Sequence, residues 1–389
     1  MSCSAVTLLV PTKNRSDFLS RLFRYFHEQG FDGVLGIADS SRGSEEQKVR
    51  ELVERYGAYL NIDYYHVPEM SQIRATLHLA KNIKTPFVAE LQDDNFLIPE
   101  SIKRCIRFLE EHPDYSAATG LGISLKTFES QPFGPITKCV KMPQPDASNA
   151  SSEHRFLELM SNYSDVHFSV MRKNTYQRFI RGCDIEDPRF FQSLASCIVV
   201  IEGRVKRFPG LHLVRQMQDE PYRAPEYGPL VPWLLGENWG KHQKKFKDMI
   251  ADALSVELNV DSQTAEKVLH KGMQLYLLSS LAGEVSTDPQ LERFSDRIFQ
   301  SGVLRVRLNS RRHTMFRIVR HLTNKIDQFL IFSETKCLRR RVFAERSRDV
   351  RGNWVMAHLL DKQSEYYESF EPIFRLITQG QRLTEGKSA

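Results

Sequence analysis

The first 112 residues alternate between two hydrophobic patterns. Short runs of β-branched and other apolar residues predict buried strands at 5–11, 33–41, 60–68 and 86–92. After each run, apolar residues recur every three or four positions, which predicts helices at 16–30, 44–57, 71–84 and 99–113. A regular alternation of strands and helices predicts a parallel β-sheet with helices on both faces.

Polar residues follow each of these predicted strands. They lie at 12–15, 39–41, 66–71 and 93–95. In parallel α/β sheets, ligands bind beyond the carboxyl ends of the strands, close to the switch in strand order. These four clusters are therefore the places where this architecture would carry chemistry.

The pattern changes after residue 115. Two further strands are predicted at 116–128 and 167–176, and a loop rich in Pro, Ser and Asn separates them at 132–152. From about residue 237 the apolar spacing is helical, and Pro and Gly cluster just before it. Because 389 residues are too many for one ordinary core, we expect an α/β domain at 1–228 and a helical domain at 229–389.

The composition is that of a soluble globular protein, with 41% hydrophobic and 26% charged residues. No stretch of eighteen apolar residues occurs, so no transmembrane helix is expected, and the N-terminus lacks the basic start of a signal peptide. The six cysteines show no C-x-x-C spacing, which argues against a zinc site and a disulfide framework. We therefore expect free thiols and a cytoplasmic location.

The net charge of +6 is concentrated in the C-terminal half. Residues 305–351 hold 14 Lys or Arg and only 4 Asp or Glu. A basic segment at 303–351 suits peripheral contact with an anionic membrane face, and the alternative is a helical bundle with a solvated basic face. No nucleic-acid-binding motif accompanies it, so no nucleic-acid partner is expected. The helical domain is also a candidate surface for homo-oligomerisation.

Asp93 and Asp94 come directly after the fourth predicted strand. A carboxylate pair at a strand end suits Mg²⁺ or Mn²⁺, which prefer oxygen ligands and often combine one or two carboxylates with substrate phosphates. The alternative is an Asp-Asp-Asn turn that leads into the helix at Pro99, since Asp and Asn favour turns. The two residues by themselves leave both interpretations open.

Basic side chains are expected near the same edge of the sheet. Lys13 and Arg15 lie between the first strand and the first helix, where cations and free N–H groups suit a phosphate. Arg74 and Lys81 are seven residues apart on the third helix, which places them on one face that could reach a diphosphate. The alternatives are a solvated loop and an exposed helix face.

Two more candidate groups lie further along the chain. Glu186 and Asp187 precede a helix that starts at Pro188, so either carboxylate is a candidate general base, and the alternative is a helix cap. His212 lies in an apolar segment and is either a metal ligand or a structural histidine.

The order of these features resembles the GT-A glycosyltransferases, and more narrowly the bacterial family 2 nucleotide-sugar transferases. The matching features are Pro-Thr-Lys-Asn-Arg at 11–15, Asp39 after the second strand, the basic third helix, the acidic residues after the fourth strand and the later Glu-Asp pair. The resemblance covers roughly residues 5–220. It implies a GT-A fold with a Rossmann-like, mostly parallel sheet, followed here by the α-helical domain.

The resemblance also implies a role for each matching residue. The nucleotide-sugar site would comprise Pro11, Thr12, Lys13, Arg15, Asp39, Arg74, Lys81 and Asp93. A divalent metal, Mn²⁺ or Mg²⁺, would be bound by Asp94, Asp93 and His212. The catalytic base would be Asp187 or the adjacent Glu186.

One residue departs from the family pattern. The family places Asp at both ends of a three-residue acidic motif, and here those residues are Gln92, Asp93 and Asp94. A neutral amide lowers the negative charge of the site and weakens the expected metal binding. Asp94 then becomes the main expected ligand, with Asp93 second. The departure leaves open a metal-independent enzyme or a non-catalytic scaffold with the same fold.

The activity implied by the resemblance is an inverting transfer of a sugar from a nucleotide-diphosphate donor to a hydroxyl of a glycan or other acceptor, in bacterial glycan or glycoconjugate synthesis. The metal and nearby cations would stabilise charge on the departing diphosphate, and a carboxylate would take the proton of the attacking hydroxyl. A sugar-1-phosphate nucleotidyltransferase is the less favoured alternative, because it needs a Gly-rich loop after the first strand and residues 11–17 contain no glycine.

Overall fold

The computed structural model describes residues 2–218, 230–287 and 352–385. Residues up to Ser279 and from Arg351 onward form one compact unit, and a second unit spans Ser280–Val350. Of the second unit the structure describes only the end of one helix. The basic segment predicted at 303–351 lies outside the described residues.

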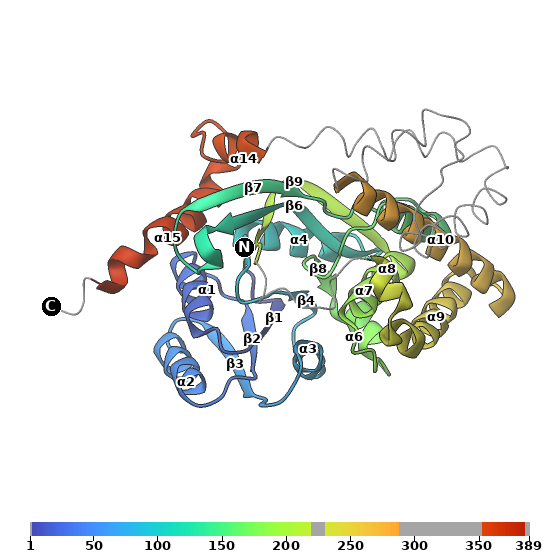
Figure 1. The fold of residues 1–389 in the computed structure, drawn as a ribbon, viewed down its shortest axis with the longest axis horizontal. Helices are drawn as coiled ribbons and strands as arrows, with labels where there is room; N and C mark the ends of the chain where they lie inside the picture. Colours follow the sequence, from blue (N-terminus) through green and yellow to red (C-terminus); the bar gives the residue numbers. More distant parts are fainter. Residues whose placement is uncertain (1, 219–229, 288–351, 386–389) are drawn as a thin grey trace, which may run out of the picture. The chain divides into compact units, whose positions relative to one another are not determined.

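The N-terminal part of the sheet is parallel. Its strands, in spatial order, are β3 (Asn61–His66), β2 (Val34–Asp39), β1 (Val6–Thr12) and β4 (Phe87–Glu90). The connecting helices are α1 (Ser16–Glu28), α2 (Ser44–Tyr56) and α3 (Gln72–Lys81). Helices α1 and α2 lie on one side of these strands and α3 on the other (Figure 1). The predicted alternation of strands and helices, with helices on both faces, is confirmed.

Beyond β4 the sheet becomes mixed and reaches nine strands, in the order β3-β2-β1-β4-β8-β6-β9-β5, with β7 paired to β6. Strand β8 is antiparallel to β4 and β6, whereas β9 is parallel to β6. The elements are β5 (Phe96–Leu97), α4 (Pro99–Glu111), β6 (Tyr115–Thr127), β7 (Ile136–Met142), α5 (Ser152–Ser161), β8 (Val170–Arg172), α6 (Lys173–Ile180), α7 (Pro188–Glu202) and β9 (Arg204–Gln216).

Two details in this region differ from the sequence prediction. The strand predicted at 167–176 is only three residues long, because α6 begins at Lys173 and buries Tyr176 on its inner face. The loop predicted at 132–152 contains β7, which pairs with β6.

The C-terminal helices that the structure describes pack on the α/β part of the chain. They are α8 (Leu230–Leu235), α9 (Glu237–Leu258), α10 (Ser262–Thr287), α14 (Gly352–Leu359) and α15 (Tyr367–Glu385). Helix α9 packs on α5 and α7, α14 packs on β7, and α15 packs on α1 (Figure 1). The predicted α/β class with C-terminal helices is confirmed, while the domain boundary at residue 228 stays a prediction. None of the described helices has the length and apolar character needed to cross a bilayer.

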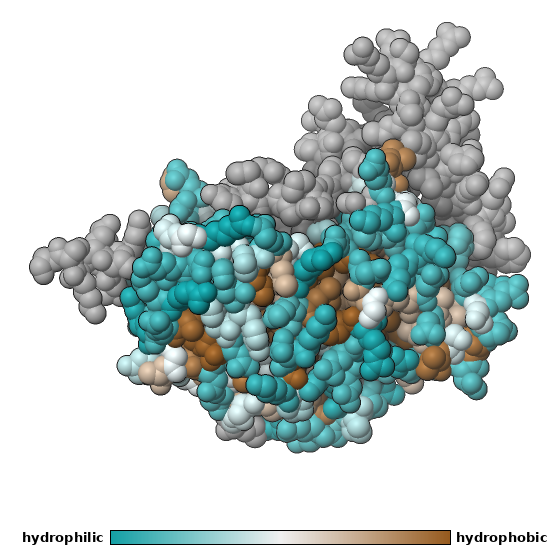
Figure 2. Space-filling model, turned by 90° about the horizontal axis from the view of Figure 1, so that it is seen from below, coloured by the Kyte–Doolittle hydropathy of each residue, from teal (hydrophilic) through white to brown (hydrophobic). Residues whose placement is uncertain are grey.

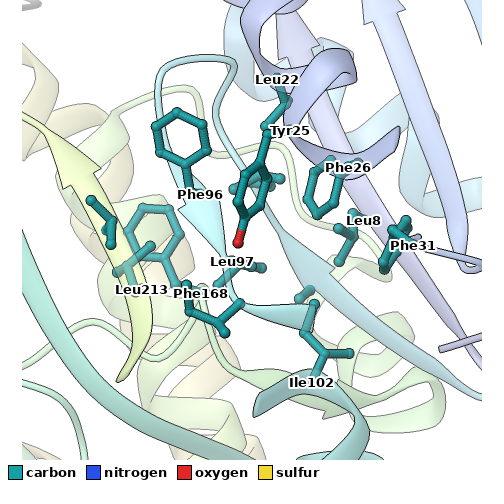
Figure 3. Close-up of a cluster of buried hydrophobic side chains, with 14 of the residues drawn as sticks. Leu8, Leu22, Tyr25, Phe26, Phe31, Phe96, Leu97, Ile102, Phe168 and Leu213 are labelled. Carbon is teal, nitrogen blue, oxygen red and sulfur yellow. The ribbon is translucent and has the colours of Figure 1, made fainter. Parts of the chain in front are cut away.

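The main hydrophobic core joins α1 to the segment that follows β4. Tyr25 and Phe26 of α1 are buried beside Phe96 of β5, and the rings of Tyr25 and Phe96 meet edge to face at 5.0 Å (Figure 3). Phe370 and Ile373 of α15 belong to the same buried cluster. Burying side chains of this size stabilises each by about 1.5–3 kcal/mol. The core therefore fixes the loop between β4 and β5 against α1.

The surface in Figure 2 is mostly hydrophilic, with apolar side chains gathered toward the middle of that face. Among the described residues, the large apolar side chains with high exposure are Tyr59, Phe128, Leu235 and Val256. They come from four separate segments of the chain, and single exposed apolar residues of this kind are ordinary in soluble proteins.

Candidate active site

The carboxyl ends of the parallel strands meet at one edge of the sheet. Thr12, the last residue of β1, pairs with Asp39, the last residue of β2, and Asp39 pairs in turn with His66 of β3. Strand β4 runs along the other side of β1, and the loop after it carries Asp93 and Asp94. The fold thus brings the polar clusters of the sequence together at this edge.

One guanidinium joins the two aspartates. Arg15 Nη1 lies 2.9 Å from Asp93 Oδ1, and Arg15 Nη2 lies 2.9 Å from Asp94 Oδ2. Thr12 Oγ1 donates a hydrogen bond of 2.7 Å to Asp93 Oδ2. Both aspartates are only 3% exposed, so these contacts take the place of water around their charges.

A second arginine lies beneath this pair. Arg21 is 1% exposed and donates from Nη2 to the main-chain oxygen of Asp94 over 3.1 Å. Its Nη1 donates to Gln216 Oε1 over 2.7 Å, and its guanidinium lies 4.9 Å from the centre of the Phe96 ring. Burial lowers the pKa of Arg21 to about 9, so this side chain stays mostly charged at neutral pH. Two arginines therefore balance the two aspartates.

Local structure explains why Arg15 reaches both carboxylates. Asn14 has a positive φ of 54°, a conformation that Asn tolerates better than most residues, and it turns the chain sharply between β1 and α1. Its backbone N–H donates to Ser41 Oγ over 2.7 Å, which anchors the turn to the end of β2. Arg15 follows directly, and its guanidinium stacks 4.1 Å from the ring centre of Phe18.

Opposing influences act on the Asp93 carboxyl. Burial raises the pKa of Asp93 to about 6, the nearby Arg15 charge lowers it, and the like charge of Asp94 adds to the rise. At neutral pH Asp93 is therefore mostly ionised and the guanidinium bridge is intact. Perturbed carboxyls of this kind occur at functional sites and also in structural ion-pair networks.

Asp94 offers one carboxylate oxygen to a ligand. Its Oδ2 accepts hydrogen bonds from Arg15 and from Gln218 Nε2 at 2.8 Å, while its buried Oδ1 has no hydrogen-bond partner among the described residues. The described part of the chain contains no group of three or more His, Cys, Asp or Glu placed to hold a metal. The residues therefore fit Mg²⁺ or Mn²⁺ only where phosphates and water supply most of its ligands.

Asp39 is held by its own neighbours. It is 0% exposed, and its two carboxylate oxygens accept hydrogen bonds from the Ser41 N–H at 2.8 Å and the Tyr64 hydroxyl at 3.1 Å. Lys13, two residues before Arg15, is exposed. This end of the sheet thus presents a cation to solvent and a rigidly positioned carboxylate below it.

The third helix separates its two predicted cations. Arg74 is in the first turn of α3, where it pairs with Glu186, whereas Lys81 is the last residue of the helix and is exposed. Because α3 runs back along the strands with a rise of about 1.5 Å per residue, the two residues lie about 10 Å apart along its axis. The structure therefore brings Arg74 to the strand ends but not Lys81.

The predicted acidic pair before α7 divides into two different environments. Asp187 is 1% exposed and caps α7: its Oδ1 accepts from the Phe190 N–H at 2.9 Å, and its Oδ2 accepts from Trp233 Nε1 at 3.0 Å. Glu186 is more exposed, and it lines a cavity near the strand ends. Of the two candidate bases, Glu186 is the one that faces open space.

His212 is buried, and the partners of its ring are a serine hydroxyl and a main-chain oxygen. Its Nδ1 is 2.9 Å from Ser101 Oγ and its Nε2 is 3.0 Å from the Phe168 main-chain oxygen, so both ring nitrogens are engaged. Complete burial lowers the pKa of His212 to about 4, which keeps the ring neutral. This geometry favours the structural alternative over the predicted metal ligand.

A cavity of about 180 Å³ opens beside this edge of the sheet. Its walls come from the end of β1, the start of α3, the end of β4, the segment before β8 and the start of α7. Pro11, Gln92 and Glu186 are the residues of the sequence-based site that line it. The cavity therefore lies between the acidic motif and the candidate base.

Sequence reasoning missed two residues of the cavity wall, Glu90 and His167. Glu90 lies in β4, within an otherwise apolar run, and a carboxyl at such a position is the signal that would have singled it out. The signal for His167 is absent, since its place beside Glu90 depends on the pairing of segments that are 77 residues apart in the sequence.

A family model describes part of this chain. Residues 7–171 match the glycosyl transferase family 2 model. This match identifies residues 7–171 as a family 2 glycosyltransferase domain. This match covers β1 to β8, including the acidic pair and Arg15, and the mixed, mostly parallel sheet with C-terminal helices is of the GT-A type, as predicted.

Several solved structures are similar to this chain at low identity. TarS of S. aureus is 14% identical over 71% of this chain and 43% of that chain, with a TM-score of 0.46. TarS 1–349 in complex with UDP-GlcNAc is 14% identical over 75% of this chain and 77% of that chain, with a TM-score of 0.46. Mannosyltransferase PcManGT from Pyrobaculum calidifontis, in complex with GDP-Man and Mn²⁺, is 11% identical over 75% of this chain and 83% of that chain, with a TM-score of 0.41.

No curated protein matches the sequence. The chain spans less than half of the first TarS structure that it matches. These similarities assign no ligand to this chain.

Proposed function

We propose that this chain is an inverting glycosyltransferase that moves a sugar from a nucleotide-diphosphate donor to a hydroxyl of a glycan or similar acceptor, in bacterial glycan or glycoconjugate synthesis. The observation that carries this proposal is the charge-balanced acidic pair at the strand ends of a family 2 domain, where one buried oxygen, Asp94 Oδ1, still lacks a partner. A polar atom buried in this way costs about 1–3 kcal/mol unless a ligand satisfies it.

The diphosphate of the donor would lie over the loop after β1. Lys13 is exposed there and would contribute a positive charge, and Thr12 fixes the acidic pair below. Asp94, with Asp93, would hold Mg²⁺ or Mn²⁺, which when bound stabilises negative charge on the departing diphosphate. Arg15 keeps both carboxylates in place and compensates their charge while the site is empty of substrate.

Glu186 would act as the general base. In the reaction the acceptor oxygen forms a bond to the anomeric carbon, the bond from that carbon to the diphosphate breaks, and the acceptor proton passes to the Glu186 carboxylate. Glu186 lines the cavity, whereas both oxygens of Asp187 already accept hydrogen bonds. We therefore assign Asp187 the task of capping α7 and holding Glu186 in position. One direct displacement inverts the configuration at the anomeric carbon.

The test is an assay of nucleoside-diphosphate release from a panel of nucleotide sugars, with product identity read by mass spectrometry. We expect one donor to be consumed, and we expect Glu186→Gln to lower the rate by about 10²–10⁴-fold while donor binding persists. Glu100→Gln, at an exposed position on α4, is the matched control. Full activity of Glu186→Gln together with loss in Asp187→Asn would return the role of base to Asp187.

A non-catalytic scaffold is the second candidate. It is favoured by the presence of Gln92 in the acidic motif and by the complete compensation of Asp93 and Asp94 by two arginines. A protein that binds a nucleoside diphosphate but consumes no donor in the panel would support this candidate. The proposed partners of the C-terminal half, a membrane surface or a second copy of the chain, involve residues outside those the structure describes.

A further inference from the structure

The cavity beside Gln92 is large enough for one group of a ligand and too small for a whole nucleotide sugar. Its volume is about 180 Å³. Pockets that enclose drug-sized ligands occupy about 300–1,000 Å³. A cavity on the scale of a single sugar ring, located between the acidic motif and Glu186, is placed where the transferred group of a donor would lie under the proposed function, on which this inference rests.

The described lining of this cavity combines apolar and polar side chains. It includes amide and hydroxyl side chains, and its ionisable groups are the carboxyls of Glu90 and Glu186 and the imidazole of His167. None of the described lining residues is Lys or Arg. The Glu186 carboxylate is paired with Arg74, so Glu90 is the one carboxyl of the lining without a basic side chain paired to it among the described residues.

The Glu90 carboxyl accepts a hydrogen bond from a neutral hydroxyl. Its Oε1 accepts a hydrogen bond of 2.7 Å from the Tyr176 hydroxyl, and its backbone N–H donates to the His167 main-chain oxygen over 3.0 Å. Burial raises the pKa of Glu90, while the neighbouring charge of His167 lowers it and the like charge of Asp165 adds to the rise. A carboxyl in this setting hydrogen-bonds to hydroxyls and disfavours a second carboxylate, because none of the described lining residues is a Lys or Arg that could compensate two negative charges.

His167 supplies the second observation. It is 4% exposed, and its Nδ1 is buried with no hydrogen-bond partner among the described residues. A buried ring nitrogen without a partner is rare in folded proteins and calls for a ligand or a water. His167 and Glu90 line the same cavity, and their backbones are hydrogen-bonded.

Two helices, α3 and α7, start at the cavity, and a side chain caps the N-terminus of each. Ser71 caps α3 by accepting from the Arg74 N–H, and the Asp187 carboxylate caps α7. The negative charge of Asp187 offsets the partial positive charge at the start of α7.

We propose that this cavity binds the ring of a neutral donor sugar, with the Glu90 carboxyl and His167 Nδ1 hydrogen-bonding its hydroxyls, and that it excludes sugars that carry a carboxylate. The selected group is the substituent of the ring that faces Glu90. A neutral hydroxymethyl group can hydrogen-bond to Glu90, whereas a uronate carboxylate in the same place meets Glu90 with no Lys or Arg among the described lining residues to pair with.

The test compares donors that differ in that one group. Isothermal titration of the full chain with UDP-glucose and UDP-glucuronate, and with GDP-mannose and GDP-mannuronate, is carried out next to free UDP and GDP, each with Mn²⁺. For whichever nucleotide binds, we expect the neutral-sugar donor to bind at least tenfold more tightly than its uronate counterpart. Glu90→Gln should reduce this ratio severalfold, whereas Glu110→Gln, at an exposed position on α4, should leave it unchanged.

The outcomes separate this inference from the proposed function. Equal affinity for the neutral and uronate donors, or an unchanged ratio in a folded Glu90→Gln variant, would overturn the inference while leaving nucleotide binding intact. Absence of binding by every nucleotide and donor would overturn both. Because the main comparison uses the unchanged protein, it decides the matter even where Glu90→Gln does not fold.

Discussion

Two groups of carboxyls lie near the same edge of the sheet in this molecule, and they are stabilised in different ways. Asp93 and Asp94 are compensated by the charges of Arg15 and Arg21. Glu90, three residues earlier, is held by a tyrosine hydroxyl, and Asp187 across the cavity is held by a backbone N–H and an indole N–H.

The difference indicates which ligand each group suits. A carboxylate balanced by arginines sits in a network of full charges, which suits the strongly charged diphosphate and a cation of a donor. A carboxyl held by neutral donors suits a neutral, hydroxyl-bearing group. The two settings therefore divide the site into a charged half and a neutral half, and each of the following predictions tests that division.

The largest effect is expected from Arg21→Met. Removing one member of a buried charge network leaves the others uncompensated, which typically costs about 3–5 kcal/mol of folding free energy. Chemical unfolding followed by circular dichroism measures this loss. The control is Arg24→Met on the same helix, whose exposed pairing with Glu28 should contribute no more than about 1 kcal/mol. Equal losses in the two variants would contradict a compensating role for Arg21.

Asp187→Ala should have a smaller effect, on the neutral side of the comparison. Loss of a helix cap costs about 0.5–2 kcal/mol, and the Trp233 indole N–H also loses its acceptor. Thermal unfolding measures the change, with Ser151→Ala at the start of α5 as a control that removes a cap away from the cavity. A loss as large as that of Arg21→Met would show that Asp187 belongs to the charged half.

Arg15→Gln should strengthen the binding of Mn²⁺ to the ligand-free protein by about tenfold, which corresponds to about 1.4 kcal/mol. The guanidinium occupies one oxygen of each aspartate, so its removal frees both for the metal. Electron paramagnetic resonance of added Mn²⁺ reports the free ion directly, and Arg24→Gln is the control. Unchanged affinity would show that Arg15 does not compete for these oxygens.

A further effect is expected in the pH dependence of stability. The pKa of Asp93 rises from 3.8 to about 6 in the folded protein, so the folded state binds this proton more tightly than the unfolded state does. Its contribution to stability is present below pH 3.8 and is lost as the pH rises toward 6. We therefore expect the free energy of unfolding of the wild type, minus that of Asp93→Asn, to fall as the pH rises across this interval. A difference that rises would mean that Arg15 outweighs burial.

Much of the charged half was predictable, because it depends on local patterns. The alternation of strands and helices places the residues after β1, β2 and β4 at one edge, so Thr12, Asp39 and the acidic pair had to lie close together. The turn at Asn14 and the cap at Asp187 follow from the preferences of single residues. These features require no knowledge of long-range contacts.

The rest depends on contacts between distant segments. From the sequence, Arg21 is expected on the polar, exposed face of an amphipathic helix. In the structure it is buried, and one of its hydrogen-bond partners is Gln216, which is 195 residues away. Lys81 follows Arg74 by seven residues, a spacing that predicts one shared helix face, but it lies at the opposite end of α3. The cavity itself is formed by five separate segments of the chain. The sequence alone therefore could not predict that Glu90 and His167 line the same cavity.

The central claim is that the loop after β4 binds the diphosphate end of a donor through Asp94 and a divalent cation. The most direct test is isothermal titration of the full chain with UDP, GDP and CDP, with and without Mn²⁺, repeated on Asp94→Ala. We predict tight binding of one nucleotide that requires Mn²⁺ and is lost in the variant. Binding that is equal with and without Mn²⁺ and survives in Asp94→Ala, or no binding at all, would contradict the claim and leave the acidic pair as a structural turn held by its arginines.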